Sequence, residues 1–518
     1  MIWGTKGARY SHDVASFVRK VKTASGATAV QIVDKRAGVR RIVEHLGSAH
    51  DEAELAVLMQ VARERLNAGQ DELDLGLDTP APAVGARARV VASSSQVLWD
   101  VLVDAYQRLG FTVLDDEAFM KLVLARVIEP VSKADTVRVL HDLGVGAPHV
   151  NTLHAALARA NGRDYRGQLA TACRAHSART TGTGALVLYD VTTLHFETDD
   201  EDDLRKVGMS KEHRVDPQVQ VGLLVDPGGF PLEVHLFEGN KAETTTLIPV
   251  LTAFQARHGV TDMVVVADAG MLSAANLGAL EDAGFSFIVG SRITKAPYDL
   301  ADHFERHGNY FTDGQILESS RVMGTGKAAR TRRVVYQWSF KRNKHDDRAI
   351  NAMIERAEKI AAGRAPLKKA RFLKITGATK ALDQATIDRA RQLAGLKGYV
   401  TNLPIETMDG AAVINAYHDL WRVEQSFRMT KSDLRARPVF HHRRDAIEAH
   451  LSVVFAALAI SRHLQDATDT SIKKLVQTLR PLRSIVISIG EHTITADPTI
   501  TTDARAILDR LPPITLGH

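Results

Sequence analysis

Two short apolar runs that each lead to an aspartate constrain the fold of this chain more than any other feature. Residues 185–191 read Ala-Leu-Val-Leu-Tyr-Asp-Val, so that Asp190 closes the first run, and Asp268 follows the second run at 263–267. Such runs are typical of strands that are buried on both faces of a sheet. Either aspartate alone fits equally well as a cap of the following loop. Two of them in one sheet favour a shared site, because ligands gather at the carboxyl ends of strands.

The pattern around these runs alternates between strands and helices. Two further strands flank the turn Asp226-Pro227-Gly228-Gly229 and are predicted to form a hairpin. The predicted order is strand, strand, strand, helix, strand, helix and strand, at residues 185–191, 219–225, 231–237, 243–258, 263–267, 274–283 and 285–289. This order predicts an α/β layer in which an antiparallel hairpin lies beside parallel strands.

The chain before this layer divides into two predicted segments. Residues 1–85 contain a hairpin, at 17–23 and 28–33, a charged helix at 52–66 and a proline-containing linker at 78–85. Residues 86–180 are predicted to be mostly helical, with helices at 97–109, 117–127, 134–143 and 151–159. Ser132 is the expected N-cap of the third helix. The last two helices could form a DNA-binding helix-turn-helix, but ordinary helical packing is the better interpretation.

The chain after the α/β layer begins with a basic segment. Residues 181–290 hold the layer, and residues 291–397 interrupt its alternation, so we interpret them as an insertion. Residues 398–465 are predicted to form a strand at 398–402 and helices at 410–430 and 444–463, and residues 466–518 a tail with a hairpin at 485–489 and 493–496. The basic side chains of the insertion are Arg330, Arg332, Arg333, Lys341, Arg342, Lys344, Arg364, Lys368, Lys369 and Arg371.

A third acid, Glu424, lies on the predicted helix at 410–430. Tyr417 precedes it by seven residues and Lys431 follows it by seven, which is close to two helical turns each way, so the three side chains share one face. An acid between a phenol and an ammonium suits a metal-bound phosphodiester. The alternative is a solvated face with an ion pair. Trp421 is better explained as a core residue than as a base-stacking platform.

Composition excludes several classes of protein. The chain has 518 residues and a formal net charge of +5, which favours polyanionic partners only modestly. Its one cysteine, Cys173, excludes an internal disulfide and a multi-cysteine zinc site, and it fits a reducing cytoplasm. We expect no signal peptide and no membrane span, since the longest apolar run is far shorter than a bilayer requires. No Gly-x-Ser-x-Gly elbow and no P-loop occurs in the sequence.

These residues resemble the DDE transposases of bacterial insertion sequences, in the branch with a Tyr-Arg-Glu-Lys signature. Tyr417, Glu424 and Lys431 match that signature in place, whereas Leu420 stands where the family has Arg. Arg422 is a candidate substitute, although it points about 200° around the helix from Leu420. Other matching pieces are Asp190-Val191-Thr192-Thr193, Gly208-Met209-Ser210-Lys211, Gly229-Phe230-Pro231, Phe237-Glu238-Gly239-Asn240, Ala267-Asp268-Ala269-Gly270, Phe427-Arg428, Arg437-Pro438 and His441.

The resemblance implies an α/β fold with a ribonuclease-H-like mixed sheet flanked by helices, a basic strand-containing insertion and a mostly helical N-terminal DNA-binding region. It also implies two Mg2+ or Mn2+ ions, held by the catalytic acids Asp190, Asp268 and Glu424, with Asp190 bridging both. The reaction would be in-line phosphoryl transfer without a covalent protein–DNA intermediate. The expected DNA contacts are Tyr417, Arg422, Arg428, Lys431, Lys341, Arg342 and Lys344.

The resemblance further implies the partners and the location of the protein. Its partners would be double-stranded DNA, as the terminal inverted repeats of an element and as target DNA, and a second copy of the chain when two ends are synapsed. The location would be the bacterial cytoplasm, in association with the nucleoid. Two alternatives stay open, namely a nuclease or resolvase of the same fold that cuts without joining, and a DNA-binding protein derived from a transposase.

Overall fold

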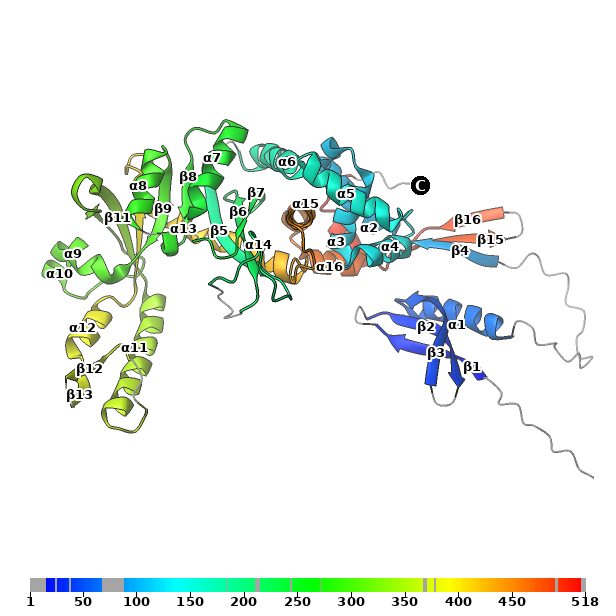
Figure 1. Cartoon of the computed structure of the whole chain (residues 1–518), viewed down its shortest axis with the longest axis horizontal. Coiled ribbons are helices and arrows are strands. Elements are labelled where there is room, and N and C mark those ends of the chain that lie inside the picture. Colours follow the sequence, from blue (N-terminus) through cyan, green and yellow to red (C-terminus); the bar gives the residue numbers. More distant parts are fainter. Residues whose placement is uncertain are drawn as a thin grey trace, which may run out of the picture. The chain divides into compact units, whose positions relative to one another are not determined.

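The computed structural model describes residues 15–23, 26–36, 39–67, 88–182, 184–209, 215–242, 245–271, 273–366, 370–376, 379–489 and 492–513. The predicted linker at 78–85, Ser210-Lys211, Lys368 and Lys369 lie outside the described residues, as does the predicted start of the helix at 243. The chain divides into a smaller unit, from residues 1–98 and 477–504, and a larger unit, from residues 99–476 and 505–518. Figure 1 labels the elements of both units.

The smaller unit contains two antiparallel three-stranded sheets. The first has the order β1-β2-β3, in which the predicted N-terminal hairpin is confirmed and β3 adds an unpredicted strand. The second has the order β16-β15-β4, in which the predicted C-terminal hairpin is confirmed and is extended by β4. The elements are β1 (Ala15–Lys22), β2 (Thr28–Arg36), β3 (Val39–Ala49), α1 (Glu52–Asn67), β4 (Ala88–Ser94), β15 (Ser484–Ile489) and β16 (His492–Ala496).

An eight-stranded mixed sheet organises the larger unit. Its order is β10-β11-β14-β9-β8-β5-β6-β7, and β5, β8 and β9 run parallel while all the other neighbours are antiparallel. The predicted hairpin beside parallel strands is therefore confirmed. The strands are β5 (Leu186–His195), β6 (Gln218–Val225), β7 (Pro231–Glu238), β8 (Val264–Ala267), β9 (Ser286–Ser291), β10 (Ile316–Met323), β11 (Arg330–Trp338) and β14 (Leu396–Thr401).

Helices cover both faces of this sheet, and alternation along β5 separates the two faces. Tyr189 points to one face, where its hydroxyl lies 2.8 Å from Thr246 Oγ1 at the start of α7 (Leu247–His258). Thr192 and Leu194 point to the other face, where they line an apolar cavity together with Phe427 of α14 (Trp421–Ser432) and Val454 of α15 (Arg444–Thr468). Asp190 has the same parity as Thr192, so it points to the α14 face.

A helical layer surrounds α15. It consists of α2 (Gln96–Arg108), α3 (Glu117–Ile128), α4 (Lys133–Asp142), α5 (Val150–Gly162) and α6 (Tyr165–Thr180), and Ser132 caps α4 as predicted. Asp116 joins three of these helices, because it caps α3 and accepts hydrogen bonds from Arg159 at 2.7 Å and Tyr165 at 2.9 Å. One described helix, α15, is apolar and long enough to cross a membrane, but 89% of its apolar stretch is buried inside the protein, as in a core helix.

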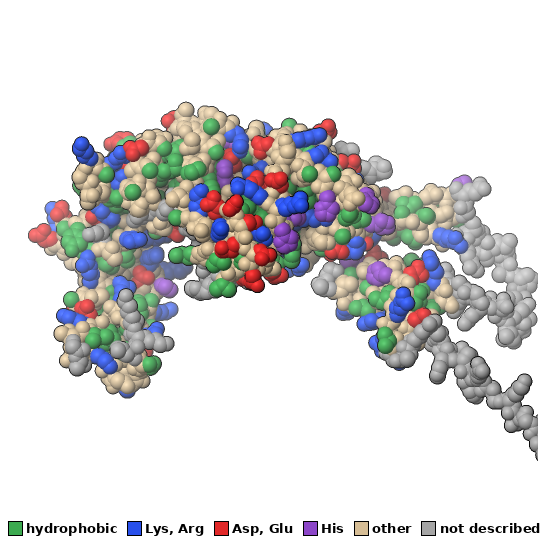
Figure 2. Space-filling view, viewed as in Figure 1, with side chains coloured by type: hydrophobic (Ala, Val, Ile, Leu, Met, Phe, Trp, Pro, Cys, Tyr) green, Lys and Arg blue, Asp and Glu red, His purple; other side chains and the backbone are tan. Residues whose placement is uncertain are grey.

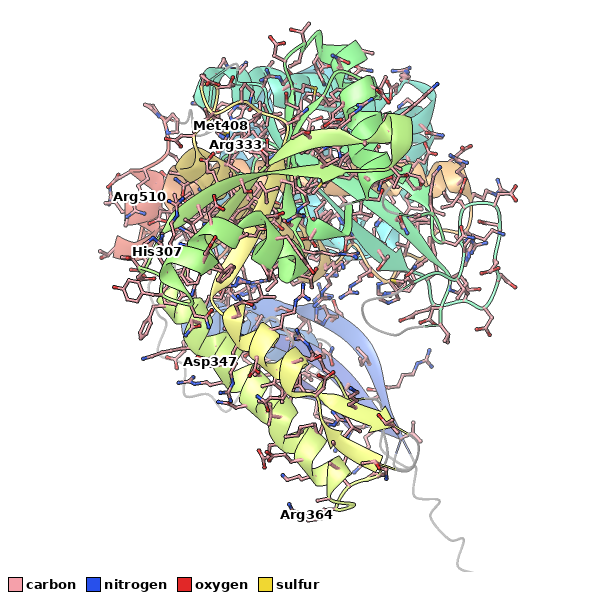
Figure 3. The ribbon with its side chains drawn as sticks, turned by 90° about the vertical axis from the view of Figure 1, so that its left-hand side faces the viewer. His307, Arg333, Asp347, Arg364, Met408 and Arg510 are labelled. Carbon is pink, nitrogen blue, oxygen red and sulfur yellow. The ribbon has the colours of Figure 1, made fainter. Side chains whose placement is uncertain are left out.

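The predicted insertion at 291–397 is in fact two structures. Its strands β10 and β11 extend the main sheet, which alternation alone could not show because their partner β14 lies outside the segment. Residues 340–394 form a projection with a small core of its own, and Figure 3 places Arg364 at its tip. The projection consists of α11 (Phe340–Ala361), β12 (Leu373–Thr376), β13 (Thr379–Leu382) and α12 (Gln384–Gln392).

The remaining described elements are short helices. They are α8 (Ala274–Asp282), α9 (Ala296–Asp299), α10 (Ala301–His307), α13 (Gly410–His418), α16 (Ile472–Leu479) and α17 (Thr502–Leu508).

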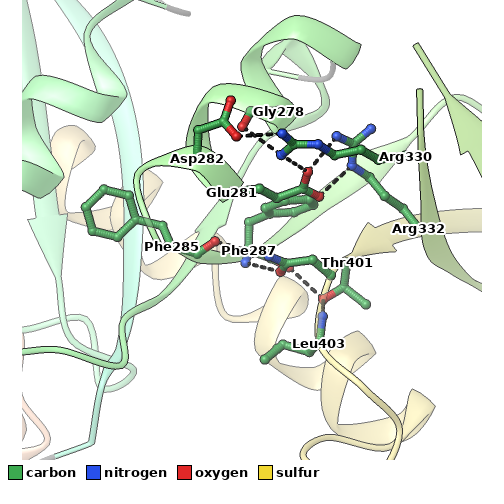
Figure 4. A network of polar contacts seen from close by, with 10 residues as sticks. Gly278, Glu281, Asp282, Phe285, Phe287, Arg330, Arg332, Thr401 and Leu403 are labelled. Atoms are coloured by element: carbon green, nitrogen blue, oxygen red, sulfur yellow. Dashed lines mark hydrogen bonds and ion pairs between the residues drawn. The ribbon is translucent and has the colours of Figure 1, made fainter. Parts of the chain in front are cut away.

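Three arginines of the basic segment pair with acids and stabilise the sheet. Arg332 on β11 is fully buried and donates to Glu281 of α8 at 2.7 and 2.9 Å, while Arg330 contacts Glu281 and Asp282 (Figure 4). Arg333 donates two hydrogen bonds of 2.8 Å to Glu318 and one of 2.6 Å to the carbonyl of Met408. These acids come from distant parts of the chain, so a count of basic residues could not reveal the pairing.

Glu233 anchors the far end of the sheet. Its side chain on β7 is buried, 3.0 Å from His235 Nε2 and 3.5 Å from His258 Nε2 of α7, and it also binds Arg257. Burial would raise the pKa of this carboxyl, but the contacts with His235 and His258 and the charge of Arg257 outweigh it and lower the pKa to about 2. The ionised carboxylate therefore stabilises the fold.

We predict that Glu233→Gln destabilises the protein at neutral pH by on the order of 3 kcal/mol, because ionisation of a carboxyl whose pKa falls to about 2 on folding contributes about that much stability. A group whose pKa is lower in the folded chain contributes stability above its unfolded pKa and loses it on acidification. The difference between wild type and Glu233→Gln should therefore shrink as the pH falls from about 4.5 towards 2. Urea unfolding at several pH values measures it. Glu238→Gln, at the exposed end of the same strand, is the control.

Candidate active site

The sequence predicted that Asp190 closes its strand. In the structure Asp190 lies in the middle of β5. The strand continues to His195 because β6 pairs with it along Leu188–His195. The other neighbour, β8, pairs only with Leu186, Val187 and Leu188 of β5 and ends at Ala267. Asp190 therefore lies where β5 has lost its β8 neighbour, so a partly exposed carboxylate opens towards the α14 face at this point.

Asp268 follows β8 directly, as predicted. The parallel register places Leu188 opposite Val266, and two further steps along each strand reach Asp190 and Asp268. Both aspartates therefore lie just past the last pair of the β5–β8 register, at the point where β8 ends. Asp268 Oδ1 accepts a hydrogen bond of 3.0 Å from the hydroxyl of Tyr417.

Two helices carry the Tyr417, Glu424 and Lys431 set, so the prediction of one continuous helix at 410–430 is wrong. Helix α13 ends at His418 and α14 starts at Trp421, with a turn at Asp419 and buried Leu420. Around the turn the backbone bonds span three residues, as in Arg422 N to Asp419 O at 2.9 Å and Val423 N to Leu420 O at 3.1 Å. Such tightening changes the direction in which later side chains point. Tyr417 is consequently buried, whereas Glu424 is exposed.

An open cleft of about 430 Å³ brings Asp190 and Glu424 together. Arg428 and Lys431 of α14 line it as well, so Glu424 and Lys431 do share one face of a helix. Arg437, which the sequence reading matched to the family but did not propose as a site residue, is a further lining residue. The cleft thus combines two acids with three cations, a composition suited to a phosphodiester and the cations that accompany it.

Tyr417 links Asp268 to Lys397 of β14, a residue that sequence reasoning missed. The ammonium of Lys397 lies 4.5 Å from the centre of the Tyr417 ring, and a side chain at Gly290 would collide with the Tyr417 hydroxyl at 2.6 Å. Burial and the charge of Asp268 raise the pKa of Tyr417, which keeps the phenol a hydrogen-bond donor. Apart from its place directly before the predicted strand at 398–402, Lys397 carried no sequence signal.

The charge of Lys397 reaches two of the three acids. Burial and the nearby Arg342 lower the pKa of Lys397, while the charges of Asp268 and Glu424 oppose that effect. The lysine is therefore within electrostatic range of Asp268 behind Tyr417 and of Glu424 in the cleft. It also brings Arg342, at the start of α11, into the surroundings of the site.

The donor chemistry of the three acids fits a divalent cation such as Mg2+, which prefers carboxylate oxygens. Asp190 and Glu424 share the cleft, and Asp268 follows the end of β8, the strand that pairs with the first residues of β5. Among the described residues, no three His, Cys, Asp or Glu side chains form one compact ligand group. Asp268 is held by Tyr417 instead, and mutual repulsion of carboxylates disfavours closer approach without a cation.

Arg422 does not take the place of the arginine missing at Leu420. Its guanidinium donates to the carbonyl of Gly228 at 3.2 Å and pairs with Asp419 at 3.2 Å, and it is not among the residues that line the cleft. Arg462 of α15 donates to the same carbonyl at 3.0 Å. Arg422 and Arg462 therefore hold the β6–β7 turn against α14 and α15. We propose this structural role for Arg422, and its contact with DNA stays a prediction.

The other basic residues proposed from the sequence lie on two elements. Arg428 and Lys431 line the cleft. Lys341, Arg342 and Lys344 lie exposed on the first turns of α11, where Lys344 is 4.7 Å from the ring of Phe340 and Arg342 is 4.0 Å from Asp346. Their contact with DNA stays a prediction, as does a helix-turn-helix formed by α4 and α5. Trp421 is half exposed beside Arg422, so its assignment to the core is wrong.

We predict that Arg422→Ala lowers the free energy of unfolding by about 1–3 kcal/mol, because the Gly228 carbonyl loses a charged donor. The affinity for duplex DNA should change by less than about twofold, since the guanidinium faces the turn and not the cleft. Urea unfolding and fluorescence anisotropy measure the two quantities. Arg428→Ala, in the same helix, should show the reverse pattern, with weaker binding and unchanged stability. A large loss of DNA affinity in Arg422→Ala would contradict the structural assignment.

The chain is similar to known transposases over the residues that form this site. The family model described as "Transposase DDE domain" matches residues 181–460, which contain the sheet, the three acids and Lys397. No curated protein matches the chain. A solved structure of "piggyBac transposase synaptic complex with hairpin DNA" is similar over 73% of this chain and 70% of that chain, at 10% identity and a TM-score of 0.37, too low to support any argument. Because the family model covers more than half of its length, the chain belongs to the transposase DDE domain family.

Proposed function

We propose that this chain is a metal-dependent DNA transposase that cleaves DNA at the ends of an element and joins the 3′ ends to target DNA. The observation that carries the proposal is the meeting of Asp190 and Glu424 in one cleft, with Asp268 directly after the end of the neighbouring strand β8. The match of the family model over residues 181–460 supports the transposase role. Asp190 and Glu424 come from segments far apart in sequence, so their meeting in the cleft has no local explanation.

Divalent cations bound to Asp190, Asp268 and Glu424 would activate the attacking oxygen and stabilise the leaving oxygen of an in-line displacement. The chain's own residues would do the rest. Arg428, Lys431 and Arg437 would bind phosphate oxygens in the cleft and position the scissile group. Tyr417, as a neutral phenol, orients the Asp268 carboxylate through its 3.0 Å hydrogen bond. Lys397 would offset the negative charge that the acids and the phosphate bring together.

Loss of any one acid should abolish cleavage. We predict that Asp190→Asn, Asp268→Asn and Glu424→Gln each slow Mg2+-dependent cleavage of element-end DNA by at least about a hundredfold, the usual cost of one preorganised catalytic group. Their affinity for the same DNA should stay within about twofold of wild type, because each variant removes a negative charge and leaves every cationic side chain in place. Asp433→Asn, an exposed acid just after α14, is the matched control and should cleave normally. Normal cleavage by any triad variant would refute the site.

Joining separates the proposal from its two alternatives. A strand-transfer assay with a pre-cleaved 3′ end and plasmid target should yield joined products in Mg2+ or Mn2+. Cleavage without joining would identify a nuclease or resolvase of the same fold. Binding without metal-dependent nicking would identify a DNA-binding protein derived from a transposase. Two ends must meet for transposition, so we also propose a dimer on DNA.

Lys397 should matter for the rate and not for folding. We predict that Lys397→Ala slows cleavage by about tenfold or more with little change in the thermal midpoint, because a half-buried cation beside Asp268 and Glu424 is lost. Lys397→Arg should recover most of the rate, since it keeps the charge. Lys374→Ala on β12, which is exposed, is the control. Equal rates for Lys397→Ala and Lys374→Ala would exclude Lys397 from the site.

A further inference from the structure

A second group of cations lies away from the cleft, where α3 and α4 meet the segment that follows α14. Lys133 Nζ, at the first residue of α4, is 2.6 Å from His441 Nε2. Arg126 of α3 and Lys133 line the same small cavity, which His450 of α15 also lines, and the rings of His441 and His450 are 5.2 Å apart. Figure 2 shows Lys, Arg and His side chains gathered over this part of the larger unit.

In the part of the chain that the structure describes, the contacts of Arg126 and Lys133 are with a carbonyl and a histidine and not with an acid. Arg126 donates one hydrogen bond, of 2.8 Å, to the carbonyl of Arg435, but its Nε atom is buried and has no hydrogen-bond partner among the described residues. Glu129 is the one acid that lines the cavity, and its carboxylate is 2.5 Å from Arg138. Two half-buried positive charges side by side are costly unless an anion accompanies them.

The titration behaviour of the group agrees with this excess of charge. Burial and the charge of Arg126 lower the pKa of Lys133 to about 8, and burial with the charges of Lys133 and Arg126 lowers the pKa of His441 to about 4. Both shifts point the same way, because burial and the neighbouring cations disfavour the protonated forms. An anion bound at the group would reverse both effects.

The position of the group close to the cleft favours a DNA phosphate as the anion. His441 follows Arg437 by four residues, and Arg437 lines the cleft that holds Asp190 and Glu424. Four residues of chain span at most about 14 Å, which is about four nucleotide steps along one strand of B-DNA. Between them, Val439 N donates to the carbonyl of His195, at the end of β5, at 3.1 Å, so the segment is tied to the strand that carries Asp190.

From this geometry we propose that Lys133, Arg126 and His441 form a phosphate-binding site that holds the DNA backbone a few nucleotides from the cleft. The ligand is a backbone phosphate of duplex DNA, and this part of the inference rests on the proposed function. The site joins the helical layer to the catalytic sheet along one DNA strand. It also gives α4 a role in DNA binding that does not need a helix-turn-helix.

The first test measures DNA affinity of the full chain in EDTA, where no cleavage can occur, with a fluorescein-labelled duplex and a series of KCl concentrations. For Lys133→Gln, we expect several-fold weaker binding and a slope of log Kd against log salt that is smaller by about 0.9, the value for one phosphate contact. Arg138→Gln is the matched control on the same helix. It removes the same charge, but Glu129 and Asp142 already neutralise Arg138, so its slope should match wild type. Equal slopes for the two variants would overturn the site.

The second test separates a binding site from a structural contact. Without phosphate, Lys133→Gln should melt at or above the wild-type temperature, because one of two like charges is gone, whereas a structural lysine would lower the melting temperature when lost. Inorganic phosphate should raise the melting temperature of wild type and Arg138→Gln more than that of Lys133→Gln. Stabilisation by inorganic phosphate with unchanged DNA slopes would mean a site for small anions only and would overturn the DNA assignment.

The outcomes distinguish the two proposals. A reduced slope for Lys133→Gln in a protein that never cleaves DNA would retain the phosphate site and reject the transposase reaction. Cleavage by wild type with identical slopes for all variants would retain the reaction and reject the phosphate site. Lys133→Arg serves as a folding check, since it keeps the charge and should restore the wild-type slope.

Discussion

The parallel pairing of β5 with β8 sets the positions of most other parts of the larger unit. It aligns Asp190 with Asp268, and its early end at Ala267 leaves the middle of β5 open on one side. The open stretch is where α14 lies against the sheet and where the cleft forms. A longer β8 would have covered Asp190 with backbone. The shortness of one strand therefore makes room for a polar site inside an otherwise apolar layer.

Placement of α14 depends on a small number of polar contacts around the β6–β7 turn. Arg422 and Arg462 both donate to the carbonyl of Gly228, and Ser426 donates to that of Gly229 at 3.3 Å. Gly229 has a positive φ of 87°, and a side chain there would lie 2.9 Å from Arg422, so glycine is needed for both reasons. The β6–β7 turn thus fixes the position of α14, the helix that carries Glu424, although the turn and α14 are far apart in sequence.

Charge is used in two distinct ways across the molecule. The arginines of β11 form ion pairs with acids of α8, as Arg332 does with Glu281, and these pairs stabilise the sheet. Around the cleft and near α4, cations outnumber the acids that contact them, as with Arg428 and Lys431 in the cleft and Lys133 and Arg126 near α4. Paired arginines add stability, whereas the excess cations are the residues for which we propose phosphate contacts.

The sequence by itself determined the approximate positions of the strands and helices, and it gave Asp190, Asp268 and Glu424 as candidate metal ligands. Apolar runs and alternation located β5, β8 and their neighbours within a few residues, because burial on a sheet leaves a local pattern. The prediction that Glu424 and Lys431 share one helical face is also confirmed, since both lie on α14 and line the cleft. Tertiary structure alone decided what depends on non-local contacts. The turn at Leu420 separates Tyr417 from Glu424, Arg422 serves the β6–β7 turn, β10 and β11 join the main sheet, and Lys397 reaches Tyr417. Partners in such contacts lie tens or hundreds of residues apart, so periodicity, which reports only local burial, carries no record of them.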